Sequence, residues 1–354
     1  MNQNNSLNKR ILIKPFIYKR ESLGFESIKI LILLLVQVFM LFVTKTYNSV
    51  ILILVSVLAS SLSDIFVAKV FNQKQHFSLY VALIQGILIG MLIPGTFSPV
   101  TVFFCVFLSM FICKYAFGGF SFTWINPVIF NVLVLWFVNS ASFPQLLVTK
   151  DILMMRNPCL LLIENGTFPI LPFDTQITDF INSQIFNIFK VSIPEGYVSL
   201  FLDSASIIPA FRFNFLTLIS SIFIFSADLN KAIVPFSFLA VYLLLVRLVS
   251  PIVTECYPMQ GDMILSLLTS GTLFFAVFVI NSYGTQPIST YGKIAYGVIL
   301  GLLAFLIVGC GTSSIGMIFT VLIADIFSLL IQWHEENLNR KKVSKLVKAF
   351  ESEE

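Results

Sequence analysis

The sequence predicts an all-α integral membrane protein with about ten transmembrane helices, arranged as two inverted five-helix repeats with broken or re-entrant segments. Its composition is the first reason. Hydrophobic residues make up 57% of the 354 residues and charged residues only 11%, whereas a soluble domain carries charge on about a quarter of its positions. The mean hydropathy is +0.92. Most of the protein surface is therefore expected to face lipid.

Ten apolar runs, each about long enough to cross a bilayer, are the second observation. Lipid offers no hydrogen-bond partners to backbone amides and carbonyls, so each run is expected to form a helix. The runs lie at about 28–46, 50–68, 79–95, 99–117, 125–140, 211–226, 232–249, 263–281, 292–309 and 315–333.

The distribution of basic residues predicts that both chain ends lie in the cytoplasm. An even number of spans places the two ends on one side of the membrane, and segments rich in Lys and Arg remain in the cytoplasm. Both ends of this chain are basic. The residues concerned are Lys9, Arg10, Lys14, Lys19 and Arg20 at the N-terminus, and Arg340, Lys341, Lys342, Lys345 and Lys348 at the C-terminus.

One large segment without an apolar run divides the spans five and five, and the same alternation places it outside. The expected divisions are a cytoplasmic basic N-terminus at 1–27, a first five-helix half at 28–140, an external loop at 141–196, a second five-helix half at 197–333 and a cytoplasmic charged tail at 334–354. Such a split is typical of transporters built from inverted repeats.

Helix-breaking residues interrupt the apolar runs in both halves. Gly118 and Gly119 precede Asn126-Pro127 in the first half, and a glycine-rich stretch lies at 309–316 in the second. Proline removes a backbone donor, and glycine adopts conformations that other residues avoid. Backbone groups freed in this way are tolerated in a membrane where they line a cavity. A bound polar or aromatic ligand would explain the breaks, and so would close packing of helices.

Ionisable residues in or at the margins of the apolar runs include Asp64, Asp203, Arg212, Asp228, Asp262 and Asp325. Each needs a partner or water, because a charge near the bilayer centre costs at least about 2.5–3.5 kcal/mol. Asp64 and Asp325 are the deepest, and they suit either an ion pathway or a capping role at a helix end. Arg212 follows Pro209 at the start of a span, which suits a broken helix facing an anionic group or an interfacial anchor.

Several kinds of soluble chemistry have no support in the sequence. It contains no Walker loop, GxGxxG, GxSxG or HExxH motif, so nucleotide hydrolysis, soluble dinucleotide binding and serine or zinc hydrolysis are not expected. The five cysteines form no CxxC pair, and the only histidines are His76 and His334. We therefore predict no metal site and no nucleic-acid partner.

Four stretches in order resemble the D subunit of Rnf electron-transport complexes and the related B subunit of the sodium-pumping NADH:quinone oxidoreductase. The stretches are Phe117-Gly118-Gly119 with Ile125-Asn126-Pro127; Tyr197 to Pro209; Gly261-Asp262 with Leu267-Leu268-Thr269-Ser270-Gly271; and Gln286-Pro287-Ile288-Ser289-Thr290 through Gly292 to Tyr296-Gly297. The stretch from Gly261 to Gly297 is the most specific.

The resemblance implies a multi-pass protein of the bacterial cytoplasmic (inner) membrane that works with other Rnf-type membrane subunits and carries flavin. In the family, FMN is attached by a phosphoester to the threonine of an S/T-G-A-T motif in the outer loop, and Thr178 is the best positional match. Here Gln176 and Ile177 replace the Gly and Ala. A flavin held without a covalent bond, FMN or riboflavin, is the alternative. The candidate cofactor-binding residues are Thr178, Gly118, Gly119, Asn126 and Arg212.

Two functions are compatible with these observations. The first is a membrane subunit of an Rnf-type ion-translocating complex, a translocase that carries flavin and passes electrons across the membrane. The second is a stand-alone transporter of a small solute, such as a flavin, built on the same two-half architecture. The breadth of the resemblance favours the first, and the altered acceptor motif favours the second.

Overall fold

A computed structural model describes residues 22–70, 78–115, 123, 125–155, 158, 162, 169–190, 192–255, 259, 261–281 and 285–351. Every regular element within these residues is a helix, which confirms the predicted all-α class. Five helical segments are long and apolar enough to cross a membrane: Leu23–Val43, Tyr47–Val70, Leu229–Leu248, Thr290–Val308 and Gly316–Ser344. Four shorter apolar helices accompany them: Leu79–Leu92, Pro99–Lys114, Pro127–Val138 and Asn214–Ala227.

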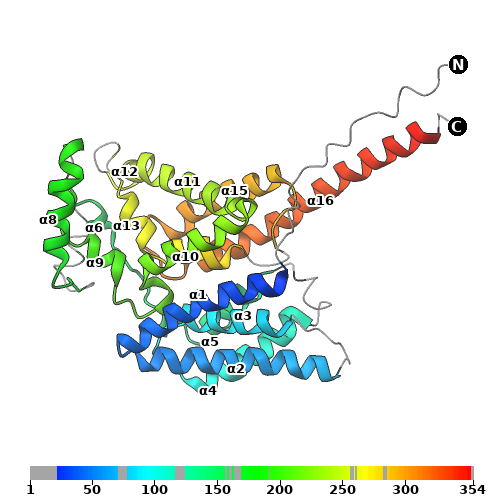
Figure 1. Cartoon of the computed structure of the whole chain (residues 1–354), viewed down its shortest axis with the longest axis horizontal. Helices are drawn as coiled ribbons and strands as arrows, with labels where there is room; N and C mark the ends of the chain where they lie inside the picture. Colours follow the sequence, from blue (N-terminus) through cyan, green and yellow to red (C-terminus); the bar gives the residue numbers. More distant parts are fainter. Residues whose placement is uncertain are drawn as a thin grey trace, which may run out of the picture.

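The first group of helices forms one side of the molecule (Figure 1). It consists of α1 (Leu23–Val43), α2 (Tyr47–Val70), α3 (Ser78–Leu92), α4 (Pro99–Met110) with the following π-helix η1 (Phe111–Tyr115), and α5 (Pro127–Val138). Within it, α2 packs against α3 and α4, while α1 packs against α3 and α4 against α5.

Small residues bring α2 and α3 close together. A Cβ atom added at Gly86 would lie 2.6 Å from the Cα of Val57. The Ser56 hydroxyl donates to the Gly86 carbonyl at 2.7 Å, and the Ser60 hydroxyl donates to the Ala82 carbonyl at 2.7 Å. Glycine and serine at a helix contact are typical of membrane helices, which associate by close packing and hydrogen bonds rather than by the hydrophobic effect.

The second group forms the other side of the molecule. It consists of α10 (Asn214–Ala227), α11 (Ile233–Leu248), α13 (Met263–Leu268), α14 (Thr272–Phe274) with the π-helix η7 (Phe275–Val279), α15 (Thr290–Val308) and α16 (Gly316–Glu351). Here α11 packs against α15, and α15 packs against α16.

The apolar run at 263–281, expected to be a single helix, is interrupted between α13 and α14. Ser270 and Gly271 both have positive φ angles, of 56° and 66°, which ends the helix. The Thr272 hydroxyl donates to the carbonyls of Ser266 and Thr269, at 3.1 Å each. Side chains thus satisfy carbonyl groups that the break leaves without helical partners.

Short elements connect the two groups. The segment predicted as an external loop begins within η3 (Ser140–Ser142) and contains α6 (Lys150–Leu153), α8 (Asp174–Gln184) and η4 (Phe186–Phe189). Further along lie α9 (Tyr197–Leu202), η5 (Pro209–Phe211), η6 (Leu229–Lys231) and α12 (Ser250–Val253). Helix α8 was not predicted, because its sequence is polar and carries no apolar run.

The two groups meet along α1–α10 and α5–α16. In Figure 1, α1 begins and α16 leaves the body toward one end of the molecule, whereas α8 and α9 lie at the opposite end. Which end faces the cytoplasm stays a prediction. The charged tail expected at 334–354 is, as far as Glu351, an unbroken continuation of α16 that projects from the body.

Candidate functional site

A buried carboxylate lies where the two groups of helices meet. Asp325 extends from α16 and is 1% exposed. The Tyr296 hydroxyl donates to its Oδ1 atom at 2.9 Å, and the backbone N–H of Asn126 donates to its Oδ2 atom at 2.9 Å. Within the part of the chain that the structure describes, no Lys or Arg lies within ion-pair distance of this carboxylate. Two neutral donors therefore hold Asp325 among apolar helices.

Asn126 joins three segments at this point. Its Oδ1 atom accepts a hydrogen bond from the Val128 N–H at 3.0 Å, which caps α5, and Pro127 occupies the first turn where no donor is needed. Its Nδ2 atom donates to the Val279 carbonyl at the end of η7, at 3.0 Å. The Asn-Pro break predicted from the sequence is thus a helix start that also binds η7 and α16.

A buried ion pair lies in the first group of helices. The Lys114 Nζ atom is 3.0 Å from Asp64 Oδ1, and the two side chains are 0% and 8% exposed. Lys114 belongs to the π-helix η1, and π-helical turns are frequent at functional sites. Sequence reasoning required a partner for Asp64 but did not identify Lys114. The signal was available, because a lysine inside the apolar run 99–117 is itself unusual.

Two residues at the start of the most specific motif place α13. A Cβ atom at Gly261 would lie 2.0 Å from the carbonyl oxygen of Val246, so only glycine fits against α11. Asp262 caps α13 by accepting the Leu265 N–H at 2.8 Å, and it also accepts a hydrogen bond from the Tyr197 hydroxyl. The motif therefore fixes α13 between α11 and α9.

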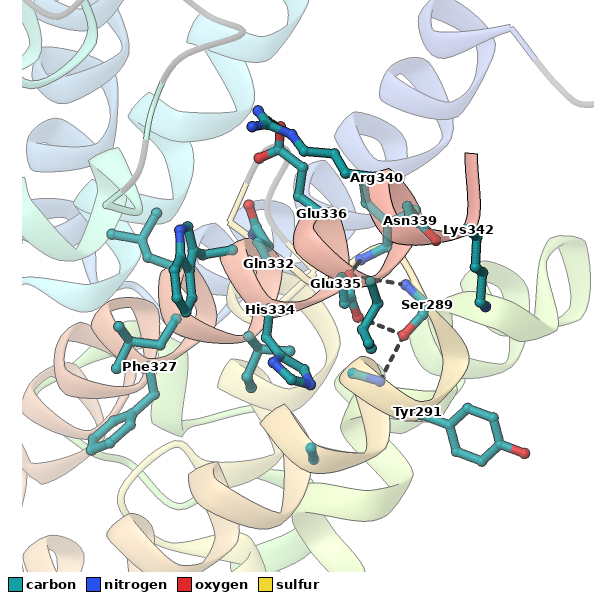
Figure 2. A pocket seen from close by; sticks show the side chains of 18 of the residues that line it. Ser289, Tyr291, Phe327, Gln332, His334, Glu335, Glu336, Asn339, Arg340 and Lys342 are labelled. Atoms are coloured by element: carbon teal, nitrogen blue, oxygen red, sulfur yellow. Dashed lines mark hydrogen bonds and ion pairs between the residues drawn. The ribbon is translucent and has the colours of Figure 1, made fainter. Parts of the chain in front are cut away.

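The other end of this motif fixes the start of α15 (Figure 2). The Glu335 carboxylate of α16 accepts hydrogen bonds from the Ser289 hydroxyl at 2.5 Å and the Ile288 N–H at 3.1 Å. A Cβ atom at Gly292 would lie 1.9 Å from Glu335 Oε1. One helical turn further along α15, Tyr296 reaches Asp325, so a single helix connects the capped end to the buried carboxylate.

Thr178, the candidate flavin acceptor, lies inside a hydrogen-bond cluster in the segment between the two groups of helices. It is 2% exposed, and its hydroxyl donates to Asp174 Oδ1 at 2.9 Å. The Asp174 carboxylate also accepts the N–H groups of Gly196 at 3.2 Å and Ser199 at 2.8 Å, as well as the Ser199 hydroxyl. Burial alone raises the pKa of Asp174, but these hydrogen bonds together lower it below its ordinary value.

This buried hydrogen-bond cluster does not fit a covalent flavin at Thr178. A phosphoester needs the threonine oxygen to be accessible to a modifying enzyme and then to carry a bulky group. Here the oxygen is buried against Asp174. Attachment would require α8 to separate from the start of α9, so we assign no reaction step to this position.

Arg212 is paired within the chain. Its Nε atom donates to Asp203 Oδ1 at 2.9 Å and its NH2 group donates to Oδ2 at 2.6 Å, a bidentate arrangement. A longer contact of 3.4 Å reaches the Thr46 hydroxyl, in the turn between α1 and α2. The anionic group that Arg212 faces is therefore Asp203.

The candidate cofactor residues do not converge on one described site. Asn126 lies at the meeting of the two helix groups, Thr178 lies in α8, and Arg212 follows η5, with no hydrogen bond joining any two of them in the described part of the chain. Gly118 and Gly119 lie outside the described residues. Their assignment to flavin stays a prediction.

Comparison with known proteins decides the family. The model of the NQR2, RnfD, RnfE family matches residues 11–340 of the chain. The chain belongs to this family. Among curated proteins, the chain is similar to the D subunit of the ion-translocating oxidoreductase complex of Aliivibrio salmonicida (strain LFI1238), with 22% identity over 308 residues that cover 81% of this chain and 86% of the relative.

Membership in the NQR2, RnfD, RnfE family confirms the resemblance that the four motifs predicted. Three of those four motifs now have structural roles in this chain. Asn126-Pro127 starts α5 against Asp325, and the stretch from Gly261 to Gly297 sets α13 and α15 in place. A multi-pass membrane protein with several apolar helices agrees with the family assignment.

Proposed function

We propose that this protein is a membrane subunit of an ion-translocating oxidoreductase complex, in which the buried Asp325 carboxylate takes part in ion movement. One observation carries the proposal: an ionisable group, held only by neutral donors among described residues, lies between two groups of apolar helices. Family membership and the Aliivibrio salmonicida relative support the assignment to such a complex.

The chemistry of Asp325 suits this role. Keeping a carboxylate ionised among apolar helices costs free energy. Such groups in membrane proteins mark ion or proton pathways. When Asp325 is ionised, both oxygens accept hydrogen bonds, from Tyr296 and Asn126. When a proton binds one oxygen, that oxygen loses acceptor capacity and its contact must weaken or change. Binding of a proton or small cation would thus be coupled to the contact between α5, α15 and α16.

Flavin carriage and passage of electrons across the membrane are the further part of the proposal. They rest on the family resemblance, and we favour a flavin held without a bond to Thr178, whose hydroxyl is buried. A bound flavin would supply the redox chemistry, while the protein would supply position and electrostatics. Other Rnf-type membrane subunits are the proposed partners.

Isolation from native membranes in mild detergent tests this function. We expect other membrane subunits to co-purify and a flavin absorbance spectrum to accompany the complex. Denaturing electrophoresis under ultraviolet light should show no fluorescent band for this chain. A fluorescent band that disappears in Thr178→Ala but persists in Thr175→Ala would instead establish covalent attachment at Thr178.

The second candidate is a stand-alone transporter of a small solute such as a flavin. The break between α13 and α14 favours it, because interrupted helices hold substrates in many transporters. In that case the protein would purify without partners, and the protein alone in liposomes would take up riboflavin. Uptake by the purified chain, without co-purifying subunits, would overturn the first proposal.

A further inference from the structure

We infer that an open groove between α15 and α16 binds an anionic phospholipid. The groove has a volume of about 1400 Å³ and lies between the first turns of α15 and the stretch of α16 from Phe327 to Ser344. Its lining residues lie where α16 leaves the helical body (Figure 1), and Figure 2 shows their side chains. The inference is independent of the proposed function.

The part of the groove nearest the helical body is apolar. Phe327 and Leu330 of α16 and Ala295 of α15 line it. Trp333 and Tyr291 lie further along, and they remain 65% and 86% exposed. Tryptophan and tyrosine concentrate at the level of the lipid headgroups, where an apolar ring and a polar tip are both satisfied. This part of the groove therefore suits acyl chains that enter from the headgroup level.

The part of the groove beyond Trp333 is charged, with both acidic and basic residues in its lining: Glu335, Glu336, Arg340 and Lys342. In Figure 2, His334 and Lys342 extend from α16 toward the side on which Tyr291 lies. Arg340 extends to the other side and pairs with Glu336 at 2.6 Å. Lys342 forms no ion pair with any described residue. An anionic headgroup would supply the missing negative charge.

Glu335, at the centre of the groove, is bound to the start of α15. Both oxygens of Glu335 are already used, by the Ser289 hydroxyl and the N–H groups of Ile288 and Ser289, the last at 3.5 Å. These contacts also hold the start of α15 against α16, so they set the distance between the two walls. The groove is thus a fixed feature of the fold.

Along the groove, an apolar wall is followed by the aromatic rings of Trp333 and Tyr291 and then by Lys342, which has no ion pair among the described residues. This order matches a phospholipid. A phospholipid presents acyl chains, a glycerol level and a phosphate in the same order, and basic residues that follow a membrane helix attract anionic lipids. A zwitterionic headgroup would leave Lys342 without net compensation. We therefore assign the groove to an anionic phospholipid rather than to a helix of another protein.

Lipid retention by the full chain tests the assignment. The protein would be placed in nanodiscs of phosphatidylcholine containing phosphatidylglycerol, extracted in detergent and weighed by native mass spectrometry. We expect retained phosphatidylglycerol to exceed its share in the nanodisc. In Lys342→Gln, retention should weaken about fivefold, corresponding to about 1 kcal/mol per basic residue. Lys69→Gln, which removes an exposed charge at the end of α2, is the matched control and should retain the lipid.

Equal retention of the two phospholipids, or equal loss in both variants, would overturn the assignment. A cross-linking measurement separates lipid from protein as the occupant. Tyr291→p-benzoylphenylalanine, illuminated in native membranes, should yield a lipid adduct of this chain. A cross-link to another protein chain, without a lipid adduct, would show that the groove is a protein interface.

Discussion

At the scale of single residues, the buried pair of Lys114 and Asp64 has the largest expected effect on stability. The two side chains are 0% and 8% exposed, so burial keeps both charges away from water and each helps to compensate the other. Removing one partner of a buried pair costs about 3–5 kcal/mol, because it leaves an uncompensated charge. We predict this loss for Lys114→Met, measured by thermal unfolding in detergent.

The double substitution Lys114→Met with Asp64→Asn should be less destabilising than Lys114→Met alone, since no charge then stays buried. The exposed pair of Arg340 and Glu336 is the control, with side chains 73% and 60% exposed. Arg340→Met should change stability by less than about 1 kcal/mol. If Lys114→Met and Arg340→Met lowered the stability by the same amount, the result would contradict the burial of the Lys114–Asp64 pair.

Asp174 gives a prediction about pH. Its pKa in the folded protein lies below the ordinary value of about 3.9. The stabilisation that it provides is therefore complete above about pH 4 and is lost as the pH falls through the folded pKa. Limited proteolysis of the segment around α8 should be slow in the wild type at neutral pH and should accelerate in strong acid.

Asp174→Asn should make the segment around α8 sensitive to protease at neutral pH and remove most of the acid-dependent change. Asp179→Asn alters an exposed carboxylate on the same helix and should behave as the wild type. If both substitutions act alike, the Asp174 cluster does not hold α8 in place.

Some of these residues were accessible from the sequence and some were not. Asn126-Pro127 has a local signature, a side-chain cap followed by proline, so its interruption of the helix was predicted. The role of Asp174 has no local signature, because its donors Gly196 and Ser199 lie more than twenty positions away in sequence. Thr178 was chosen by motif position, which gives no information about burial.

At the scale of helices, the contact between the start of α15 and Glu335 is sensitive to a single methyl group. Gly292→Ala would place a Cβ atom on a Glu335 oxygen, 1.9 Å away. The carboxylate must then move and release Ser289. We predict a destabilisation of about 1–3 kcal/mol, typical of overpacking, measured by thermal unfolding.

A matched control is available at Gly95, where an added Cβ would meet the Ser49 hydroxyl at 2.8 Å, and that side chain can rotate away. Gly95→Ala should therefore cost much less than Gly292→Ala. Combining Gly292→Ala with Glu335→Ala should cost less than the sum of the two, since both remove the same contact. Strict additivity would show that the two residues do not interact.

Apolar runs predicted the positions of most helices, because a long run in lipid has no alternative to helix. They did not predict the break at Ser270-Gly271, since that stretch keeps the small and apolar composition of a span. Helix α8 was missed for the opposite reason: its residues are polar, and Asp174 and Thr178 stabilise it through contacts with α9. Composition therefore locates membrane helices better than it locates their interruptions.

At the scale of the whole molecule, the two groups of helices are joined by a few polar contacts between residues far apart in sequence. Gln37 of α1 donates to Thr217 of α10 at 3.1 Å, and Glu26 pairs with Lys231. Asn126 contacts Val279 and Asp325. Contacts between residues so far apart in sequence leave no periodic pattern, so the sequence could not predict these pairings. The inverted repeat of two five-helix halves stays a proposal, which the contacts α1–α10 and α5–α16 support.

The predicted membrane orientation can be tested independently of mechanism. Reporter fusions after Glu351 should be active only in the cytoplasm, and fusions between Lys150 and Asp174 only outside. The reason is that α8 and α9 lie at the opposite end of the molecule from the projecting part of α16 (Figure 1). Activity of both fusions on one side of the membrane would contradict the proposed topology.

The central claim is that Asp325 takes part in ion movement, and ion uptake by the complete complex in sealed vesicles tests it most directly. With Asp325→Asn, electron transfer should drive proton or sodium uptake at least about tenfold more slowly, while the amount of assembled complex is unchanged. Asp228→Asn, at a helix end outside the buried centre, should leave uptake intact. Normal uptake by the Asp325→Asn complex would contradict the account.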